Sequence, residues 1–268
     1  MPIMDITFRS KTLMRYTDIK FVLPEIPPEN VRKEMAAYQR PTKMVILLNG
    51  YMGSNITWLY HTRLVAYSTK YNLAVAMPSG ENSFYLDGKA TGTAYCKYVG
   101  EELPDFLWST FRMDMAYEDT FIGGNSMGGF GAIHTALTYP DTFSKVLCFS
   151  PAMHIHQIAA MTPEKQNGGV GANYEFYVQR FGDPGQVEES TNNPEVLLRR
   201  LKADRKRIPE IFITCGTEDF LLDPNREFKA FLDSEHIPVT YHEGPGRHDM
   251  DFWNQWIECA IKWAVDEN

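Results

Sequence analysis

The stretch that decides the fold is Phe121-Ile-Gly-Gly-Asn-Ser126-Met-Gly-Gly-Phe-Gly131. An apolar strand pattern enters it and apolar residues at helical spacing follow it, so the stretch predicts a strand, a glycine-rich turn and a helix. Gly124, Ser126 and Gly128 match the G-x-S-x-G nucleophile elbow, in which a tight turn exposes a serine hydroxyl. The glycines suit this turn because a side chain at either position would collide with nearby backbone. The alternative is an ordinary glycine-rich connection.

Strand patterns alternate with helical patterns on both sides of this turn. The expected strands are Ile3–Arg9, Thr17–Leu23, Lys43–Asn49, Asn72–Met77, Glu118–Gly124, Ser144–Ser150, Pro209–Cys215 and Pro238–Glu243. The expected helices are Thr57–Tyr71, Tyr95–Phe111, Met127–Tyr139, Asn225–Glu235 and Met250–Val265. The middle strands are nearly continuous apolar runs, which is typical of parallel strands covered on both faces. We therefore predict one α/β domain over residues 1–268, with an eight-stranded, mostly parallel sheet, an antiparallel N-terminal edge hairpin and helices on both faces.

The segment 154–201 interrupts this alternation. It contains no convincing strand pattern, a polar glycine-rich patch at 166–171, and two short helical patterns at Tyr174–Phe181 and Pro194–Ala203. Long insertions in compact domains often form lids or binding loops. The segment is thus either an elaborated crossover connection or a small cap over a site.

Composition and charge exclude several classes of protein. The apolar content of 44% favours a folded chain, and the net charge of −8, with no offsetting basic stretch, argues against nucleic acid or an anionic membrane as a partner. No apolar run approaches the roughly 18 residues of a membrane span, and the N-terminus lacks a signal-peptide pattern, so we expect a cytoplasmic protein. The four cysteines, which have no paired spacing, are expected to be buried free thiols: Cys96, Cys148, Cys215 and Cys259.

A nucleophilic serine needs a base to accept its proton and a carboxylate to orient that base. The chain order expected for this elbow is nucleophile, acid, histidine, each following a strand. Asp219 comes directly after an apolar strand and is the favoured acid, with Glu218 and Asp223 as competitors; Asp223 also suits a helix cap. His248 lies on a glycine-rich loop before the last helical pattern and is the favoured base.

The remaining requirement of such a site is a pair of backbone N–H donors for the tetrahedral oxyanion. One is expected from Met127, the residue after the serine, and the other from the glycine-rich loop after the strand Lys43–Asn49. Tyr51 is the favoured donor there, with Met52 second. Further side chains expected near the mouth of the site are Met52, Trp58, Tyr85 and Met153. No metal or other cofactor is implied.

Together these motifs resemble the esterase D / carbohydrate esterase family 1 group of α/β-hydrolases. This group includes tributyrin-type, feruloyl and acetylxylan esterases and S-formylglutathione hydrolases. The resemblance covers nearly the whole chain and implies an α/β-hydrolase fold. It also implies Ser126 as nucleophile, His248 as general base and acid, and Asp219 as the orienting acid. One residue departs from the pattern, because Asn49 stands where the family usually has histidine.

The activity expected from this resemblance is a serine esterase that acts on short-chain, acetyl-type esters, with esters of sugars or oligosaccharides as candidate substrates. The alternatives are an S-formylglutathione hydrolase, a feruloyl esterase and, from a different class, a non-catalytic binding protein of the same fold. The loop Gly50-Tyr51-Met52 lacks the Leu-Thr-Cys run of S-formylglutathione hydrolases. The expected partner is a small-molecule ester, and because relatives often self-associate, a homo-oligomer is left open.

Overall fold

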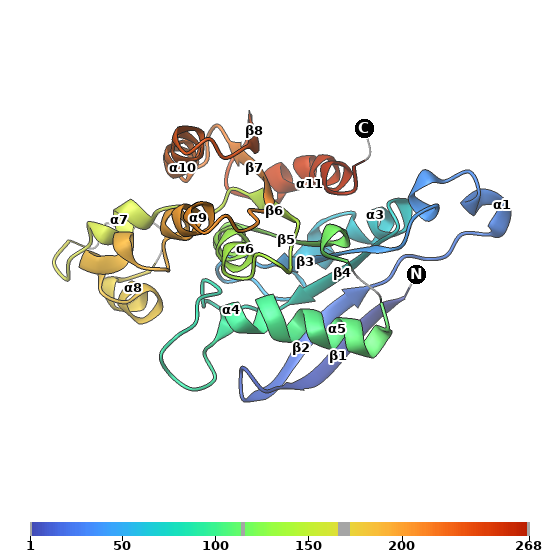
Figure 1. Cartoon of the computed structure of the whole chain (residues 1–268), viewed down its shortest axis with the longest axis horizontal. Coiled ribbons are helices and arrows are strands. Elements are labelled where there is room, and N and C mark those ends of the chain that lie inside the picture. The colour runs from blue at the N-terminus through green and yellow to red at the C-terminus, as the bar shows by residue number, and fades with distance from the viewer. Residues whose placement is uncertain (1, 114–115, 166–171, 267–268) are drawn as a thin grey trace.

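The computed structural model describes residues 2–113, 116–165 and 172–266. Eight strands form one sheet in the order β1-β2-β4-β3-β5-β6-β7-β8 (Figure 1). Their bounds are Ile3–Ser10 (β1), Arg15–Val22 (β2), Lys43–Leu48 (β3), Leu73–Pro78 (β4), Thr120–Asn125 (β5), Lys145–Phe149 (β6), Glu210–Gly216 (β7) and Val239–Gly244 (β8). All eight strand predictions are confirmed, with shifts of one or two residues at the ends.

The sheet is parallel except around β2. This strand pairs antiparallel with β1 on one side and with β4 on the other, whereas all the pairs from β4 to β8 are parallel. Parallel strands point their carboxyl ends to one edge of the sheet, where the loops of α/β proteins form sites. The predicted α/β-hydrolase architecture with an antiparallel N-terminal hairpin is confirmed.

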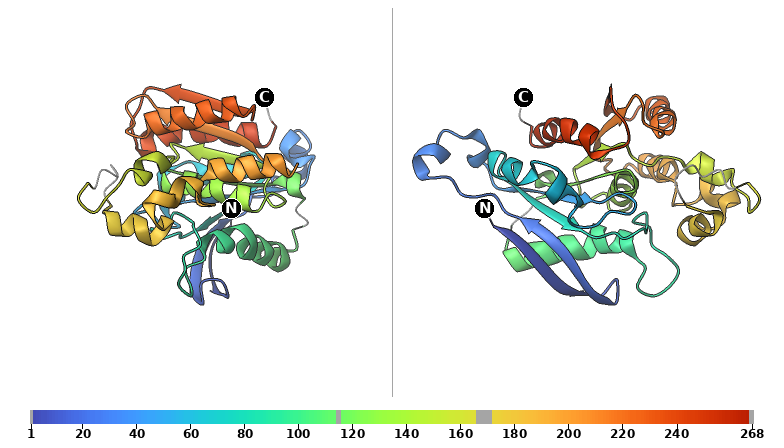
Figure 2. Two further views of the ribbon diagram at one scale, coloured as in Figure 1. Left: turned by 60° about the vertical axis from the view of Figure 1, so that its left-hand side comes forward. Right: turned by 180° about the vertical axis from the view of Figure 1, so that it is seen from behind.

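Helices cover both faces of the sheet. The views in Figures 1 and 2 show the sheet between α5 on one side and α3 and α11 on the other. Side chains of α5, α6, α9 and α10 belong to one buried cluster, and those of α2, α3 and α11 to a second. The helices are α1 Glu29–Arg32, α2 Thr57–His61, α3 Leu64–Lys70, α4 Tyr95–Lys97, α5 Leu103–Phe111, α6 Met127–Thr138, α7 Ile155–Ala159, α8 Tyr174–Phe181, α9 Pro194–Ala203, α10 Leu222–Ser234 and α11 Met250–Ala264.

Two predicted helices are interrupted for local reasons. The pattern at 57–71 is divided into α2 and α3 because the Thr62 hydroxyl donates to the Trp58 carbonyl and accepts from the Leu64 amide, while its backbone is extended. Such side-chain bonds compete with the helical ladder. The pattern at 95–111 contains a π-helical turn at Tyr98–Glu102, next to Pro104, which has no backbone N–H to donate.

The described residues of the segment 154–201 contain short helices and no strand. It contains α7, α8, the 3₁₀ helix η4 (Pro184–Glu189) and α9, whereas the predicted glycine-rich patch at 166–171 lies outside the described residues. Helices α7 and α8 lie together at the left of Figure 1, beyond the end of the sheet. The Phe84 ring holds α8 to the body, since it packs on Phe176, Tyr177 and Phe181 of α8 and on Phe130 of α6.

The cysteine prediction is correct for three thiols and wrong for one. Cys96, Cys148 and Cys215 are free and buried, but Cys259 is free and exposed. Its position on α11 explains the error, because its neighbours Ile257, Ala260 and Ile261 occupy the buried face of that helix. Within the described ranges, we find no helix long and apolar enough to cross a bilayer.

Because Phe84 is 3% exposed and joins two helices through its ring contacts, it is expected to contribute strongly to stability. Phe84→Ala should lower the free energy of unfolding by about 3–5 kcal/mol, measured by urea denaturation. Tyr60→Ala is the matched control, since Tyr60 is exposed, and it should change stability by less than about 0.5 kcal/mol. An equal loss of unfolding free energy in the two variants would contradict the conclusion that Phe84 anchors α8 to the rest of the fold.

Candidate active site

Ser126 occupies a strained turn between β5 and α6. Its φ of 53° and ψ of −120° are adopted by non-glycine residues only where surrounding structure imposes them. A β-carbon on Gly124 would lie 2.6 Å from the Gly128 carbonyl carbon, and one on Gly128 would lie 2.5 Å from the Leu48 carbonyl oxygen. Only glycine allows β5, α6 and β3 to approach so closely. The predicted strand, turn and helix around Ser126 are confirmed.

Three side chains from separate parts of the sequence meet at this turn. His248 Nε2 lies 2.9 Å from Ser126 Oγ, and His248 Nδ1 lies 2.9 Å and 3.0 Å from the two Asp219 carboxylate oxygens. An ionised carboxylate only accepts hydrogen bonds, so the proton of the neutral ring belongs on Nδ1. Nε2 is then free to accept the proton of the Ser126 hydroxyl.

Asp219 is held as a buried carboxylate. Its side chain is 0% exposed, and its Oδ1 accepts a 2.8 Å hydrogen bond from the Leu221 amide. Burial alone would raise the Asp219 pKa, but the hydrogen bond and charge of His248, followed by the Leu221 amide, hold that pKa below its ordinary value. Asp219 is therefore ionised at neutral pH and can stabilise a positive charge on His248.

The two competing acids lie elsewhere. Glu218 is exposed and joins the two loops of the site, because its carboxylate accepts from the Gly246 amide and its own amide donates to the Gly246 carbonyl. Asp223 is exposed in the first turn of α10, which begins at Leu222 and has no side-chain cap. The expectation that Asp223 caps this helix is wrong, but its place in the first turn puts a negative charge near the positive end of the helix dipole.

Rings and a helix cap fix the position of His248. Its imidazole lies between Phe220, with ring centroids 4.5 Å apart, and Trp253, which meets it edge-on at 5.0 Å. The next residue, Asp249, caps α11 by accepting a 2.9 Å hydrogen bond from the Phe252 amide. The loop therefore enters the last helix with His248 directed back to Ser126.

The loop after β3 forms a turn beside Ser126. The Gly53 amide donates to the Gly50 carbonyl, which leaves Tyr51 and Met52 at the centre of the turn. The Met52 amide is already used, since it donates to Asn82 Oδ1 at 2.8 Å. The Tyr51 amide has no acceptor among the described residues, and Met127, as the first residue of α6, has no intrahelical acceptor.

Asn49 organises this loop from a fully buried position. Its Oδ1 accepts hydrogen bonds from the Gly80 amide and the Tyr85 hydroxyl, both at 2.9 Å, and its Nδ2 donates to the Gly50 carbonyl. Asn125, just before the nucleophile position, accepts from the Gly50 amide at 3.1 Å. The Asn49 side chain thus bonds two backbone groups and the Tyr85 hydroxyl. Asn82 and Asn125 were not assigned a role from the sequence, although Asn125 ends β5 and Asn82 lies in the loop after β4.

The residues expected at the mouth divide into two groups. Met52 is 83% exposed, and Tyr51 is half-buried with its ring edge-on to Phe176 of α8. Trp58 and Tyr85 instead lie in the core, 1% and 0% exposed. The expectation that they line the mouth is corrected, because Trp58 donates to the Leu48 carbonyl and Tyr85 bonds Asn49 beneath the loop. Met153 is also buried.

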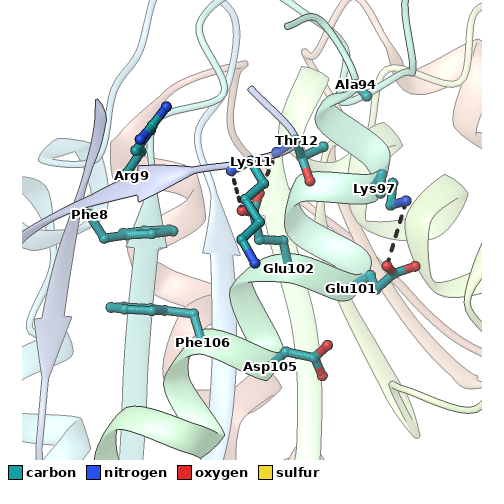
Figure 3. Close-up of a pocket in the computed structure, with 10 residues that line it drawn as sticks. All are labelled: Phe8, Arg9, Lys11, Thr12, Ala94, Lys97, Glu101, Glu102, Asp105 and Phe106. Atoms are coloured by element: carbon teal, nitrogen blue, oxygen red, sulfur yellow. Dashed lines mark hydrogen bonds and ion pairs between the residues drawn. The ribbon is translucent and has the colours of Figure 1, made fainter. Parts of the chain in front are cut away.

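A cavity of about 580 Å³ between the N-terminal hairpin and α5 contains none of these residues (Figure 3). One side of the cavity is lined by the stacked rings of Phe8 and Phe106, whose centroids lie 4.1 Å apart. Its carboxylate Glu102 already accepts from the amides of Lys11 and Thr12. This cavity therefore marks the junction of the hairpin with α5 and is separate from the site at Ser126.

The chain is similar to known esterases and serine hydrolases. The model of the family described as "Putative esterase" matches residues 10–262. An acetyl esterase of Caldicellulosiruptor saccharolyticus is 39% identical over 264 residues, which are 98% of each chain. The serine hydrolase FphF of Staphylococcus aureus superposes with a TM-score of 0.84 at 28% identity, and an S-formylglutathione hydrolase from the same organism with 0.82 at 28%; each pair covers 98% of both chains.

The family match covers most of the chain, and the acetyl esterase aligns from end to end. In the structure, a serine, a histidine and a buried carboxylate are joined by hydrogen bonds. The chain therefore belongs to this esterase family and is a serine ester hydrolase of the α/β-hydrolase fold.

Proposed function

We propose that this protein hydrolyses short-chain carboxylic esters, acetyl esters above all, with Ser126 as nucleophile, His248 as general base and acid, and Asp219 as the orienting acid. The observation that carries the proposal is the unbroken hydrogen-bonded chain from the Asp219 carboxylate through both nitrogens of His248 to Ser126 Oγ. A serine hydroxyl is a weak nucleophile at neutral pH, and this arrangement supplies the base that it needs.

The proposed reaction has two steps, formation of an acyl-enzyme and its hydrolysis. His248 Nε2 removes the hydroxyl proton of Ser126 as Oγ attacks the ester carbonyl, and the resulting imidazolium gives that proton to the departing alkoxide. Water then attacks the acyl-enzyme, again with His248 as base, and the carboxylic acid leaves as Ser126 recovers its proton. Asp219 stabilises the imidazolium in both steps and keeps its own charge.

The amides of Tyr51 and Met127 form the proposed oxyanion hole. Neither amide has a protein acceptor among the described residues, and the Met52 amide, the other candidate, already donates to Asn82. The Met127 amide also stands at the positive end of α6, where negative charge is stabilised. Charge that develops on the carbonyl oxygen would meet donors whose positions are fixed before the reaction.

Segment 154–201 is proposed to act as a cap that forms one wall of the site. Its helix α8 contacts the oxyanion loop through Phe176 and Tyr51, and Arg180 Nε donates to the Asn82 carbonyl at 3.0 Å. Asn82 in turn holds the Met52 amide. Because these contacts join the cap to the loop, a movement of α8 would be transmitted to the proposed oxyanion donors through Phe176 and Arg180.

Acetylated sugars and oligosaccharides are the proposed natural substrates. The end-to-end relative is named an acetyl esterase, which supports a small acyl group. The exposed ring of Phe220 lies beside His248, the proposed proton donor to the leaving alcohol. An exposed aromatic ring at that place can pack on the C–H face of a sugar alcohol. A cytoplasmic location is proposed as well, since a free exposed thiol at Cys259 suits a reducing compartment.

S-formylglutathione hydrolysis is the second candidate. It is favoured by the similarity to the Staphylococcus aureus enzyme of that name, with a TM-score of 0.82 at 28% identity. The same nucleophile and base would serve a thioester, so the two functions differ in the leaving group. Turnover of S-formylglutathione far above that of simple acetyl esters would replace the acetyl esterase proposal with this one.

Removal of the nucleophile or the base should abolish turnover. Ser126→Ala and His248→Ala are each expected to lower kcat for 4-nitrophenyl acetate by about 10⁴- to 10⁶-fold, because each removes a group that forms or activates the acyl-enzyme bond. Circular dichroism and thermal unfolding should show folded proteins, and a fluorophosphonate probe should no longer label Ser126→Ala. Normal turnover by folded Ser126→Ala would refute the proposed nucleophile.

The identity of the acid is tested by a matched pair of substitutions. Asp219→Asn should lower kcat by about 10⁴-fold, because an amide no longer holds the Nδ1–H form of His248 or stabilises the imidazolium. Asp223→Asn is the control, since Asp223 is exposed on α10, and it should leave kcat within about twofold. The reverse result would exclude Asp219 as the acid.

Acyl-chain preference distinguishes the candidate substrates. A panel of 4-nitrophenyl esters from acetyl to octanoyl, methyl ferulate and an acetylated xylo-oligosaccharide should give the highest kcat/KM for acetyl to butyryl groups. Ser126→Ala assayed in parallel controls for spontaneous hydrolysis. A maximum at octanoyl, or ferulate turnover above that of acetyl esters, would contradict a preference for small acyl groups.

A further inference from the structure

Asn82 is a polar side chain beside the site whose part in the reaction the proposed mechanism leaves open. It lies in the loop after β4, and its Oδ1 accepts a 2.8 Å hydrogen bond from the Met52 amide. Only the oxygen of an asparagine side chain can accept from an N–H group, so this bond fixes the orientation of the side chain. The bond joins the loop after β4 to the turn 50–53, which contains the proposed oxyanion donor Tyr51.

Met52 occupies the third position of this turn in an unfavourable backbone conformation. Its φ of 61° lies in the left-handed region, which favours glycine, and its side chain is largely exposed, which leaves little packing to impose that angle. Turns with a positive φ at the third position usually carry glycine or asparagine there, whereas the commoner type I turn has a negative φ. The bond from the Met52 amide to Asn82 therefore opposes relaxation of the turn.

The loop that carries Asn82 is itself held in place. Arg180 Nε of α8 donates to the Asn82 carbonyl at 3.0 Å. On either side of Asn82 in the sequence, the Gly80 amide and the Tyr85 hydroxyl each donate to Asn49 Oδ1 at 2.9 Å. The loop after β4 thus contacts the loop after β3 at two places, at the base of the turn and near its tip. Asn82 is fixed before it accepts the bond from the turn.

We propose that Asn82 is a positioning residue for ester hydrolysis, which holds the turn 50–53 in the form that presents the Tyr51 amide to the oxyanion. This inference rests on the proposed oxyanion hole. The contribution of Asn82 is made in the transition state, because the carbonyl oxygen gains its negative charge only as Ser126 attacks. In this role Asn82 acts through the backbone of Met52 and makes no contact with the reacting atoms.

Two substitutions of Asn82 separate its hydrogen bond from its shape. Asn82→Leu has a similar shape and no acceptor, so it should lower kcat for 4-nitrophenyl acetate by about tenfold to hundredfold, with KM near that of the wild type. Asn82→Asp retains an oxygen that can accept from the Met52 amide, and its kcat should fall by about threefold or less. Equal losses in the two variants, or wild-type kcat in folded Asn82→Leu, would overturn the proposal.

A tetrahedral inhibitor gives a readout that a merely structural role would not move. Phenylboronic acid adds to a serine hydroxyl, and one oxygen of the adduct is expected in the oxyanion hole. Its inhibition constant should therefore rise in Asn82→Leu by about the factor by which kcat/KM falls. An unchanged inhibition constant beside a reduced kcat would refute a role in oxyanion stabilisation. A raised KM with wild-type kcat would instead indicate contact with the substrate and would also refute the proposal.

A double substitution tests whether Asn82 acts through the Met52 backbone. Glycine adopts a positive φ without steric cost, so Met52→Gly added to Asn82→Leu should restore kcat by about threefold to tenfold. No recovery would refute action through this turn. Ser126→Ala distinguishes failure of the triad from failure of this inference. If Ser126→Ala stays active, the triad fails, and if it is inactive while folded Asn82→Leu has wild-type kcat, only this inference fails.

Discussion

The close approach of three backbone segments at Ser126 is the constraint on which the rest of the site depends. The carbonyl of Leu48 at the end of β3 occupies the space that a side chain on Gly128 would need, and Gly128 in turn lies against Gly124. This contact forces Ser126 into an unfavourable backbone conformation, with φ at 53°. The hydroxyl is then presented at the start of α6, next to the loop that follows β3. The same packing contacts therefore place both the proposed nucleophile and the proposed oxyanion donors.

The proposed acid and base depend on a second set of contacts, at the neighbouring strand ends. Glu218 joins the loop after β7 to the loop after β8, and Asp249 begins α11 directly after the histidine. Because Asp219 is buried, its carboxylate needs hydrogen-bond partners, since an unpaired buried carboxylate carries a large free-energy cost. His248 and the Leu221 amide supply the hydrogen bonds that keep it charged. The site is therefore stabilised by the same bonds that suit it to acyl transfer.

Long-range packing connects this machinery to the segment 154–201. Phe84 joins α8 to α6, and Phe176 on the same helix reaches Tyr51 on the oxyanion loop. Asn49, which departs from the family pattern, holds the loop after β3 through a single side-chain amide. Its amide group accepts and donates at once, so it bonds Gly80, Tyr85 and Gly50 together. A histidine ring at that position would offer its two nitrogens in a different geometry.

The sequence by itself determined the eight strands, their mostly parallel arrangement and the turn at Ser126, because periodicity and glycine spacing are local signals. It also singled out Asp219 and His248 as candidates from their order along the chain. It could not predict the break at Thr62, which depends on a side chain competing for backbone partners, nor the exposure of Cys259, which depends on the rotation of α11. It also placed Trp58 and Tyr85 at the mouth, although both are core residues bonded beneath the oxyanion loop. Tertiary structure alone decided these points and the hydrogen bond between Trp253 and Ser150, because residues 103 positions apart meet only when the sheet has brought their loops to one edge.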